Sequence, residues 1–122
     1  MTQPVAISET DRLIASNKVE GTRVYNRQGE RLGTVHNFMV GKRSGRVEYA
    51  VMEFGGILGI GNEYYPLPWE LLTYDEGQGG YVVDIDKDKL EGAPRYRDRD
   101  PLWDEVYARQ VYGYYGMPYP IF

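Results

Sequence analysis

The chain has 122 residues, a net charge of −4, no cysteine, twelve Tyr and fifteen Gly. This length suits one domain, and the missing cysteine excludes a disulfide framework and a thiolate metal site. Acids and bases are interspersed, which argues against a general nucleic-acid-binding face, and no apolar run near the N-terminus could serve as a signal peptide or membrane span. We therefore expect a soluble, cytoplasmic, turn-rich β domain.

The N-terminal part begins with residues 1–15, which lack periodicity and are expected to be flexible. Ser16-Asn17 is a plausible cap for a one-turn helix that ends at Gly21. Thr22 to Tyr25 is a short run of β-forming residues. The turn Asn26-Arg27-Gln28-Gly29 follows, in which Gly29 is free to adopt a positive φ.

The middle of the chain predicts strands separated by glycine-containing turns. The run Arg31 to Val40 holds Gly33, which suggests a bulge or a tight bend. After the turn 41–45, Val47 to Phe54 is apolar on both faces, as expected of a central strand that is covered on both sides. Glu53 interrupts this run and must face solvent or find a partner.

A glycine-rich apolar loop, 55–61, leads into the next predicted strands. Glu63 to Leu67 reads as a strand that Pro68 ends, because proline cannot donate to a ladder. A helical turn at Trp69 then leads to strands at Leu72 to Asp75 and Tyr81 to Val83, followed by a short helical or turn segment, Asp86 to Leu90. Turn signals at this spacing are typical of a small all-β barrel or sandwich.

The C-terminal part differs in character, because residues 93–99 form a polar linker and aromatic residues follow it. Asp100-Pro101 predicts an N-cap and a first helical residue, and Gly113 is expected to stop the helix. Leu102, Val106, Arg109 and Gln110 share one side of this helix. The tail 114–122 is too apolar for a solvated end, and it could dock on its own barrel or on a neighbour's.

Several ordered pieces together carry a family resemblance. They are Gly21-x-x-Val24-Tyr25, the turn Gly29-Glu30-x-x-Gly33, the strand Glu48-Tyr49-Ala50-Val51, the loop 54–61, and Pro68-Trp69 with Leu71-Leu72. From Ser16 to Glu91 the chain resembles the PRC-barrel domain family. That family includes the cytoplasmic domain of the photosynthetic reaction-centre H subunit and the C-terminal domain of a ribosome-maturation factor.

The resemblance implies a mainly β fold, a small PRC-type barrel of about six antiparallel strands. The short C-terminal helix and the aromatic tail, from Pro94 onward, lie outside the resemblance and are expected from the residues themselves. The resemblance also implies a protein-interaction or assembly module, sometimes a homodimer, without shared catalytic residues. Neither the membrane helix of the first relative nor the RNA-factor-binding domain of the second is expected, so photosynthetic and ribosomal roles are not carried over. The expected organisation is a flexible segment (1–15), the barrel (16–92), and a linker, helix and tail (93–122).

Motifs that could carry chemistry are better explained as structure. Gly56-x-x-x-x-Gly61 lacks the Lys and Ser or Thr of a phosphate loop, and a strand rather than a helix follows it. Asp84-x-Asp86-x-Asp88 resembles half of a calcium loop, but the required glycine and the twelfth-position glutamate are missing. His36, the only histidine, has no Ser or Cys partner at a recognisable spacing.

Arg95, Arg97 and Arg99 alternate with Tyr96, Asp98 and Asp100, so the acids cancel most of the field that an anionic ligand or RNA would need. We therefore predict no catalytic residue, no cofactor, no metal and no nucleic-acid partner. The predicted function is non-enzymatic binding of an unidentified protein, together with self-association; the alternative is a small ligand or ion at the barrel mouth or a subunit interface. The candidate contact residues are apolar and aromatic: Ile57, Leu58, Ile60, Trp103, Tyr107, Tyr112, Tyr114, Tyr115, Tyr119 and Phe122.

Overall fold

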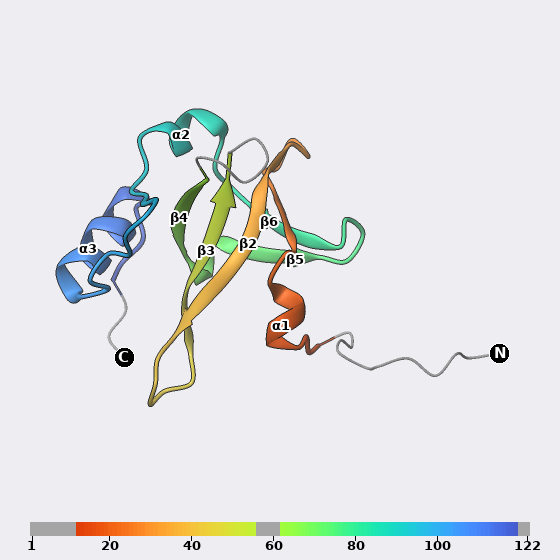
Figure 1. Cartoon of the computed structure of the whole chain (residues 1–122). Coiled ribbons are helices and arrows are strands. Elements are labelled where there is room, and N and C mark those ends of the chain that lie inside the picture. Colours follow the sequence, from red (N-terminus) through yellow and green to blue (C-terminus); the bar gives the residue numbers. More distant parts are fainter. Residues whose placement is uncertain (1–11, 56–61, 120–122) are drawn as a thin grey trace.

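A computed structural model describes residues 12–55 and 62–119 (Figure 1). Its elements, in chain order, are α1 (Ser16–Val19), β1 (Arg23–Tyr25), β2 (Arg31–Val40), β3 (Val47–Phe54), β4 (Glu63–Pro68), the 3-10 turn η1 (Trp69–Leu71), β5 (Leu72–Asp75), β6 (Gly80–Val83), α2 (Lys87–Glu91) and α3 (Glu105–Tyr114). The predicted loop residues Ile57, Leu58 and Ile60, the terminal Phe122 and most of the segment 1–15 lie outside the described residues.

The strands form one curled, six-stranded sheet in the order β4-β3-β2-β1-β6-β5, which makes a half-barrel. Neighbouring strands are antiparallel except β1 and β6, which pair in parallel through Val24 with Tyr81 and Tyr25 with Val82. The mainly β prediction is therefore confirmed, but the expectation of antiparallel strands throughout was wrong. Two parallel strands require a long connection between them, and the chain from β2 to β5 provides the connection between β1 and β6.

The turn between β1 and β2 is held by a buried side chain, Asn26, which is 1% exposed. Its Oδ1 accepts from the backbone N–H groups of Gln28 and Glu30 at 3.0 and 2.9 Å, and its Nδ2 donates to the Glu30 carboxylate. Gly29 has φ +85°, as predicted. The asparagine amide thus satisfies the turn's own backbone.

Gly33 lies in β2, at a point where the backbones of β2 and its neighbour β3 approach each other closely. The register between β1 and β2 shifts here, because Val24 pairs with Gly33 while Tyr25 pairs with Arg31. A Cβ at position 33 would overlap the Glu53 carbonyl oxygen and would lie 3.0 Å from Met52 Cγ. The bulge that the sequence suggested is present, and the close strand approach explains the glycine.

The central strand β3 is covered on both faces, as predicted. Residues 49–52 are all buried, and alternate side chains enter different clusters. Met52 lies in the main core inside the curl, together with Val24, Leu32, Leu67 and Val83. Tyr49 points the other way, into a second cluster beneath α3.

Strand β4 includes Pro68, although the sequence predicts that the strand ends at Leu67. The reason is that β4 is an edge strand. The Tyr64 N–H points outward and donates to the Tyr96 carbonyl at 2.9 Å, so Pro66 and Pro68, two and four residues further on, direct their nitrogens outward too. A proline there removes no ladder bond to β3.

Two helix starts were predicted wrongly. Helix α1 has Ala15 at its N-cap, without a side-chain cap, rather than a residue of the pair Ser16-Asn17. Helix α3 starts at Glu105 rather than at Pro101, because the Asp104 carboxylate caps it by accepting from Tyr107 N at 2.9 Å. It also runs past Gly113 to Tyr114.

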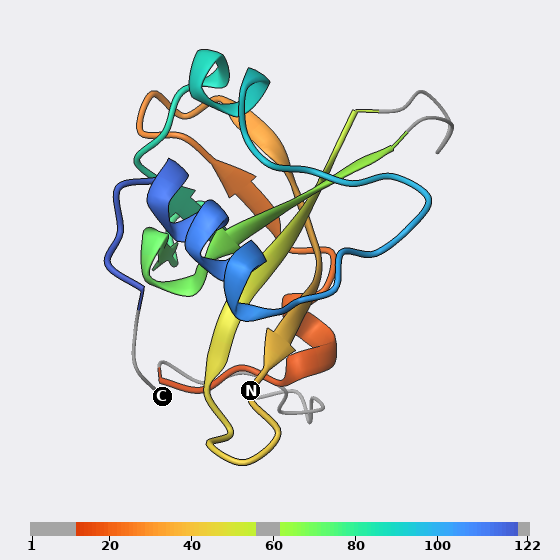
Figure 2. The same ribbon diagram turned by 90° about the vertical axis from the view of Figure 1, so that its left-hand side faces the viewer.

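Helix α3 and its approach lie across β3 and β4 (Figure 2). The chain enters α3 through Trp103, the only described residue other than glycine with a positive φ (+56°). No helix within the described ranges is long and apolar enough to cross a membrane.

Candidate interaction surface

The C-terminal segment builds a second hydrophobic core on the outer side of β3. Its buried members are Tyr49 from β3 and Ala108, Val111 and Tyr112 from α3. The Tyr49 ring lies 5.3 Å from the ring of Trp103 and 5.8 Å from that of Tyr112, centroid to centroid. Aromatic pairs at such distances and tilted angles add stability beyond the area that they bury.

Hydrogen bonds from tyrosine hydroxyls fix this segment to the barrel. Tyr112 donates to the Glu48 carbonyl at 3.0 Å, and Tyr114 donates to the Lys89 carbonyl at 2.5 Å. Residues from the end of the chain are thereby tied to β3 and to α2. Two alternatives were open for the aromatic segment: docking on its own barrel or on a neighbour's. The part that the structure describes packs within its own chain.

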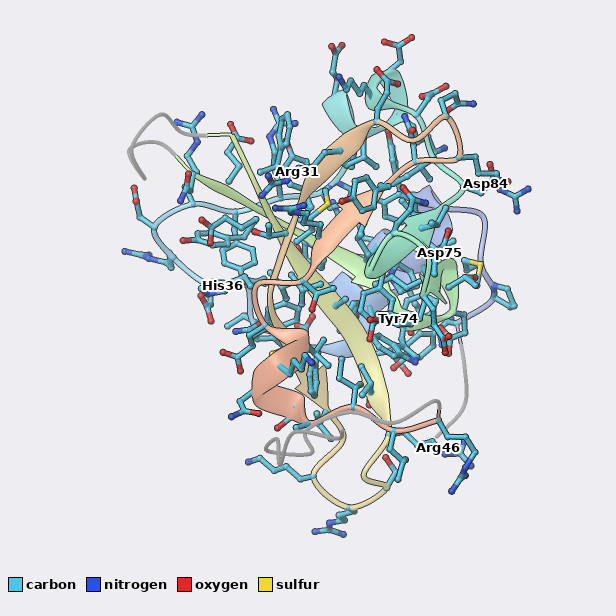
Figure 3. The ribbon with its side chains drawn as sticks, turned by 90° about the vertical axis from the view of Figure 1, so that its right-hand side faces the viewer. Arg31, His36, Arg46, Tyr74, Asp75 and Asp84 are labelled. Atoms are coloured by element: carbon cyan, nitrogen blue, oxygen red, sulfur yellow. The ribbon has the colours of Figure 1, made fainter. Side chains whose placement is uncertain are left out.

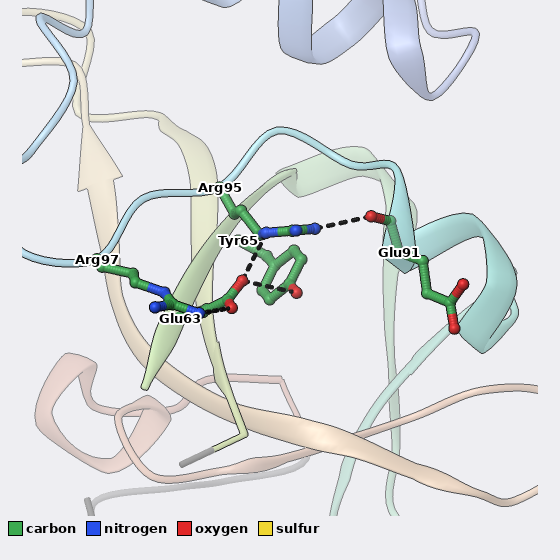
Figure 4. A network of polar contacts seen from close by, with 5 residues as sticks. All are labelled: Glu63, Tyr65, Glu91, Arg95 and Arg97. Atoms are coloured by element: carbon green, nitrogen blue, oxygen red, sulfur yellow. Dashed lines mark hydrogen bonds and ion pairs between the residues drawn. The ribbon is translucent and has the colours of Figure 1, made fainter. Parts of the chain in front are cut away.

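The linker before α3 is attached to β4 by an ion-pair cluster around Glu63 (Figure 4). Arg97 Nη2 lies 2.6 Å from one carboxylate oxygen of Glu63, and Arg95 Nε lies 2.5 Å from the other. The hydrogen bond from Arg97 lowers the pKa of Glu63, against the opposing effect of its burial. Arg95 also donates to the Glu91 carbonyl, so the linker is ordered rather than merely solvated.

The same linker adds an isolated bridge to the edge of the sheet. Tyr64 and Tyr96 exchange backbone hydrogen bonds of 2.9 and 3.0 Å, and their rings stack at 5.3 Å. The alternating arginines therefore serve a structural purpose: two of them hold a strand-like linker on β4.

Burial raises the pKa of several tyrosines in and around the second core. It raises the pKa of Tyr107 to about 12, and, together with the negative charge of Asp100, that of Tyr96 to about 12. These hydroxyls are protonated at neutral pH and cannot act as bases there. Within residues 12–55 and 62–119, the buried Trp103 Nε1, Tyr107 hydroxyl and Tyr115 hydroxyl have no hydrogen-bond partner.

The outer side of the α3 region carries exposed apolar side chains. Leu102 is 87% exposed and Val106 is 76% exposed. Beside them, Arg109 and Glu105 form an ion pair of 3.6 Å along the helix. We call Leu102 and Val106 the apolar pair. The sequence places Leu102, Val106 and Arg109 on one side of a helix, but Leu102 lies before the first residue of α3, Glu105. The predicted contact residues are the aromatic ones instead.

The predicted contact residues thus occupy different environments. Tyr112 is 1% exposed, inside the second core. The others that the structure describes are intermediate in burial and border that core or the main one: Trp103, Tyr107, Tyr114, Tyr115 and Tyr119. Sequence reasoning missed Tyr49 as their common partner, because a tyrosine in a central strand carries no signal of what covers it.

The remaining polar motifs have separate structural partners. His36 Nδ1 lies 3.4 Å from the Glu53 carboxylate, which also accepts from Asn62 at 2.6 Å. Asp86 caps α2 by accepting from Lys89 N, and Asp84 lies 3.4 Å from Arg27. The described residues contain no group of three or more histidine, cysteine or acidic side chains that could hold a metal ion.

Comparison with known families agrees with this architecture. The model of the PRC-barrel domain matches residues 11–90, which is more than half of the chain and includes all six strands. A search of curated proteins found no match. The PRC-barrel domain is a small module that is often involved in protein interactions. The linker from Ala93 onward and α3, which supplies every buried member of the second core except Tyr49, lie beyond the matched residues. The chain belongs to the PRC-barrel domain family.

Proposed function

We propose that this chain is a non-enzymatic protein-interaction module that assembles first as a homo-oligomer through the outer side of α3. The apolar pair carries the proposal, since Leu102 and Val106 are the two most exposed large apolar side chains of the described residues. Single exposed apolar residues are ordinary on a monomer, but here Leu102 lies just before α3 and Val106 lies in its first turn, so a partner that contacted this end of α3 would meet both.

The second core supports this role because it fixes α3 in place. Val111 and Tyr112 anchor α3 from beneath, with exposed fractions of 0% and 1%. An isologous contact between two copies would place the apolar pair of each α3 against the other. A preorganised helix face loses little entropy on binding, which favours association.

Point variants test this better than deleting residues 100–122. Deletion would uncover Tyr49 in β3, so a change in sedimentation could reflect lost stability. The double variant Leu102→Asp with Val106→Asp leaves the second core intact and places charges at the proposed contact. We expect it to lower the mass measured by light scattering.

The matched control is Asn17→Asp with Gln28→Asp, on exposed residues outside the C-terminal segment, and it makes the same change in net charge. It should change the mass less than the apolar-pair variant does. Equal masses for the parent chain and the apolar-pair variant, with unchanged circular dichroism, would refute assembly through this surface.

A second candidate is a small ligand at the rim of the sheet, where a hollow of about 370 Å³ lies beside Gly33. Arg31, Thr34, Glu53 and Asn62 give it polar walls, whereas the inside of the curl is occupied by the main core. Thermal-shift screening of anionic metabolites would test it. An Arg31→Ala variant with unchanged shifts would refute this site.

A further inference from the structure

A second surface, opposite in character to the apolar pair, runs from β5 to α2. One groove, of about 380 Å³, lies along β5 and β6, and another, of about 470 Å³, lies between η1, α2 with the residues that precede it, and the end of α3. They adjoin, because Leu71 and Asp84 line both. Together we call them the acidic groove.

The lining of the acidic groove combines apolar and negatively charged groups. Tyr74, Val82, Ile85 and Tyr115 are among its apolar side chains. Five carboxylates and two cations line it, a net charge of −3, compared with −4 for the whole chain. Most of the net charge of the molecule is therefore concentrated at this surface. Figure 3 shows Tyr74, Asp75 and Asp84 on this face.

Both cations of the groove already have partners. Arg27 lies 3.4 Å from Asp84, and Lys89 lies over the Tyr114 ring, 4.4 Å from its centroid. The carboxylates of Asp75, Glu76 and Asp88 form no ion pair with any described residue. A cationic partner that bound here would therefore meet three carboxylates that have no ion pair within the described part of the chain.

Two of the carboxylates are held in fixed orientations. Asp75 accepts from Gly77 N and from Gln78 Nε2, both at 2.9 Å, and these bonds, the one from Gln78 first, lower its pKa. Asp86 accepts from Lys89 N at 2.8 Å. The carboxylates of Asp75 and Asp86 are thus held in place, and the lowered pKa of Asp75 favours its charged form.

We propose that the acidic groove binds a short cationic segment of another protein, in which Lys or Arg residues alternate with apolar ones. The cations would lie against the carboxylates while the apolar side chains pack on Tyr74, Val82 and Ile85. This inference rests on the proposed interaction function and identifies the chemistry of one partner. Apolar contacts would give affinity, and charge would give specificity and a faster association rate.

Selection of random heptapeptides, displayed on phage and captured by the immobilised full-length chain, tests the idea without assuming one sequence. The expected result is enrichment of peptides in which Lys or Arg residues are separated by apolar residues. Their affinity, measured by fluorescence anisotropy, should fall as salt is added. Failure to enrich cationic peptides would overturn the proposal.

Charge-reversal variants then locate the site. Glu76→Lys with Asp88→Lys changes the groove, whereas Glu20→Lys with Asp98→Lys makes the same change in net charge at exposed residues that do not line it. We expect the first variant to weaken binding about tenfold and the second by about twofold at most. Equal weakening by both, or peptide-induced NMR shifts confined to α3, would overturn the proposal.

A second copy of this chain offers one competing occupant, the exposed hairpin tip with Lys42, Arg43 and Arg46. If Arg43→Glu with Arg46→Glu abolished self-association, and the selected peptides competed with self-association, the occupant would be that hairpin rather than another protein. Self-association through the apolar pair is measured without peptide. Failure of the groove and failure of the proposed oligomer are therefore separate results.

Discussion

Tyr112 offers the sharpest test of how the C-terminal segment is held. Its ring is 1% exposed, packs edge-on against Tyr49, and donates a hydrogen bond of 3.0 Å to the Glu48 carbonyl. Replacing it with alanine removes both the ring and the bond. Replacing it with phenylalanine removes only the hydroxyl, so the two variants separate packing from hydrogen bonding.

The expected losses follow from these contacts. Tyr112→Ala should lower the free energy of unfolding by about 3–5 kcal/mol, the range for deleting a buried aromatic side chain. Tyr112→Phe should cost about 1 kcal/mol, because it removes one hydrogen bond while the ring stays in place. For a domain of this size the alanine variant should melt roughly 10–20 °C lower.

Urea denaturation followed by circular dichroism measures both losses, and tryptophan fluorescence reports on Trp103 beside Tyr49. The measurement should be repeated across dilutions, since a contact within one chain does not depend on concentration. The reasoning would be refuted if Tyr112→Ala cost no more than Tyr112→Phe, or if its loss of stability disappeared on dilution.

Three other predictions follow from the described contacts. Burial raises the pKa of tyrosines in the second core above their ordinary value of 10.0, to about 12 for Tyr107. Because the unfolded chain loses these protons first, the stability should be constant below about pH 9 and fall as the pH rises from 10 towards 12. An alkaline titration of helicity and tyrosinate absorbance will check this. Gly33→Ala should destabilise the sheet by about 1–3 kcal/mol, because the new Cβ meets the Glu53 carbonyl, whereas Gly113→Ala, with open space around it, should stabilise α3 by up to about 1 kcal/mol in the same urea assay. Glu63→Gln should loosen the linker and speed tryptic cleavage after Arg97, with an unchanged cleavage rate refuting the importance of the ion pairs.

The sequence allowed the family and the succession of strands along the chain to be predicted, because each strand carries local signals. The turn at Gly29 and the apolar run of β3 reflect backbone freedom and burial on two faces, and both depend on neighbouring residues alone. The parallel pairing of β1 with β6 could not be predicted in this way. It joins segments far apart in the chain, and no short pattern encodes it.

The C-terminal segment shows the same limit. Asp100-Pro101 is a good local signal for a helix start, but Trp103 packs on Tyr49 and the helix starts at Glu105, four residues after Pro101. The acidic groove could be foreseen only in part: Asp84 and Asp88 are close in the sequence, but only the curled sheet brings Asp75, at the end of β5, to the same surface. Tertiary contacts override the local helix propensity at the start of α3, and local propensity does not determine which carboxylates meet in the acidic groove.

The outward side of β4 has a consequence for aggregation. Tyr64 has its N–H bonded to Tyr96, while Pro66 and Pro68 have none, so an incoming strand finds no donor along this margin. A fibril lengthens only if every added molecule offers a fresh pairing edge behind it. A molecule with only one edge strand available for pairing stops such growth after it has bound a single partner. Exposure of the edge opposite β4 can therefore yield dimers but not filaments.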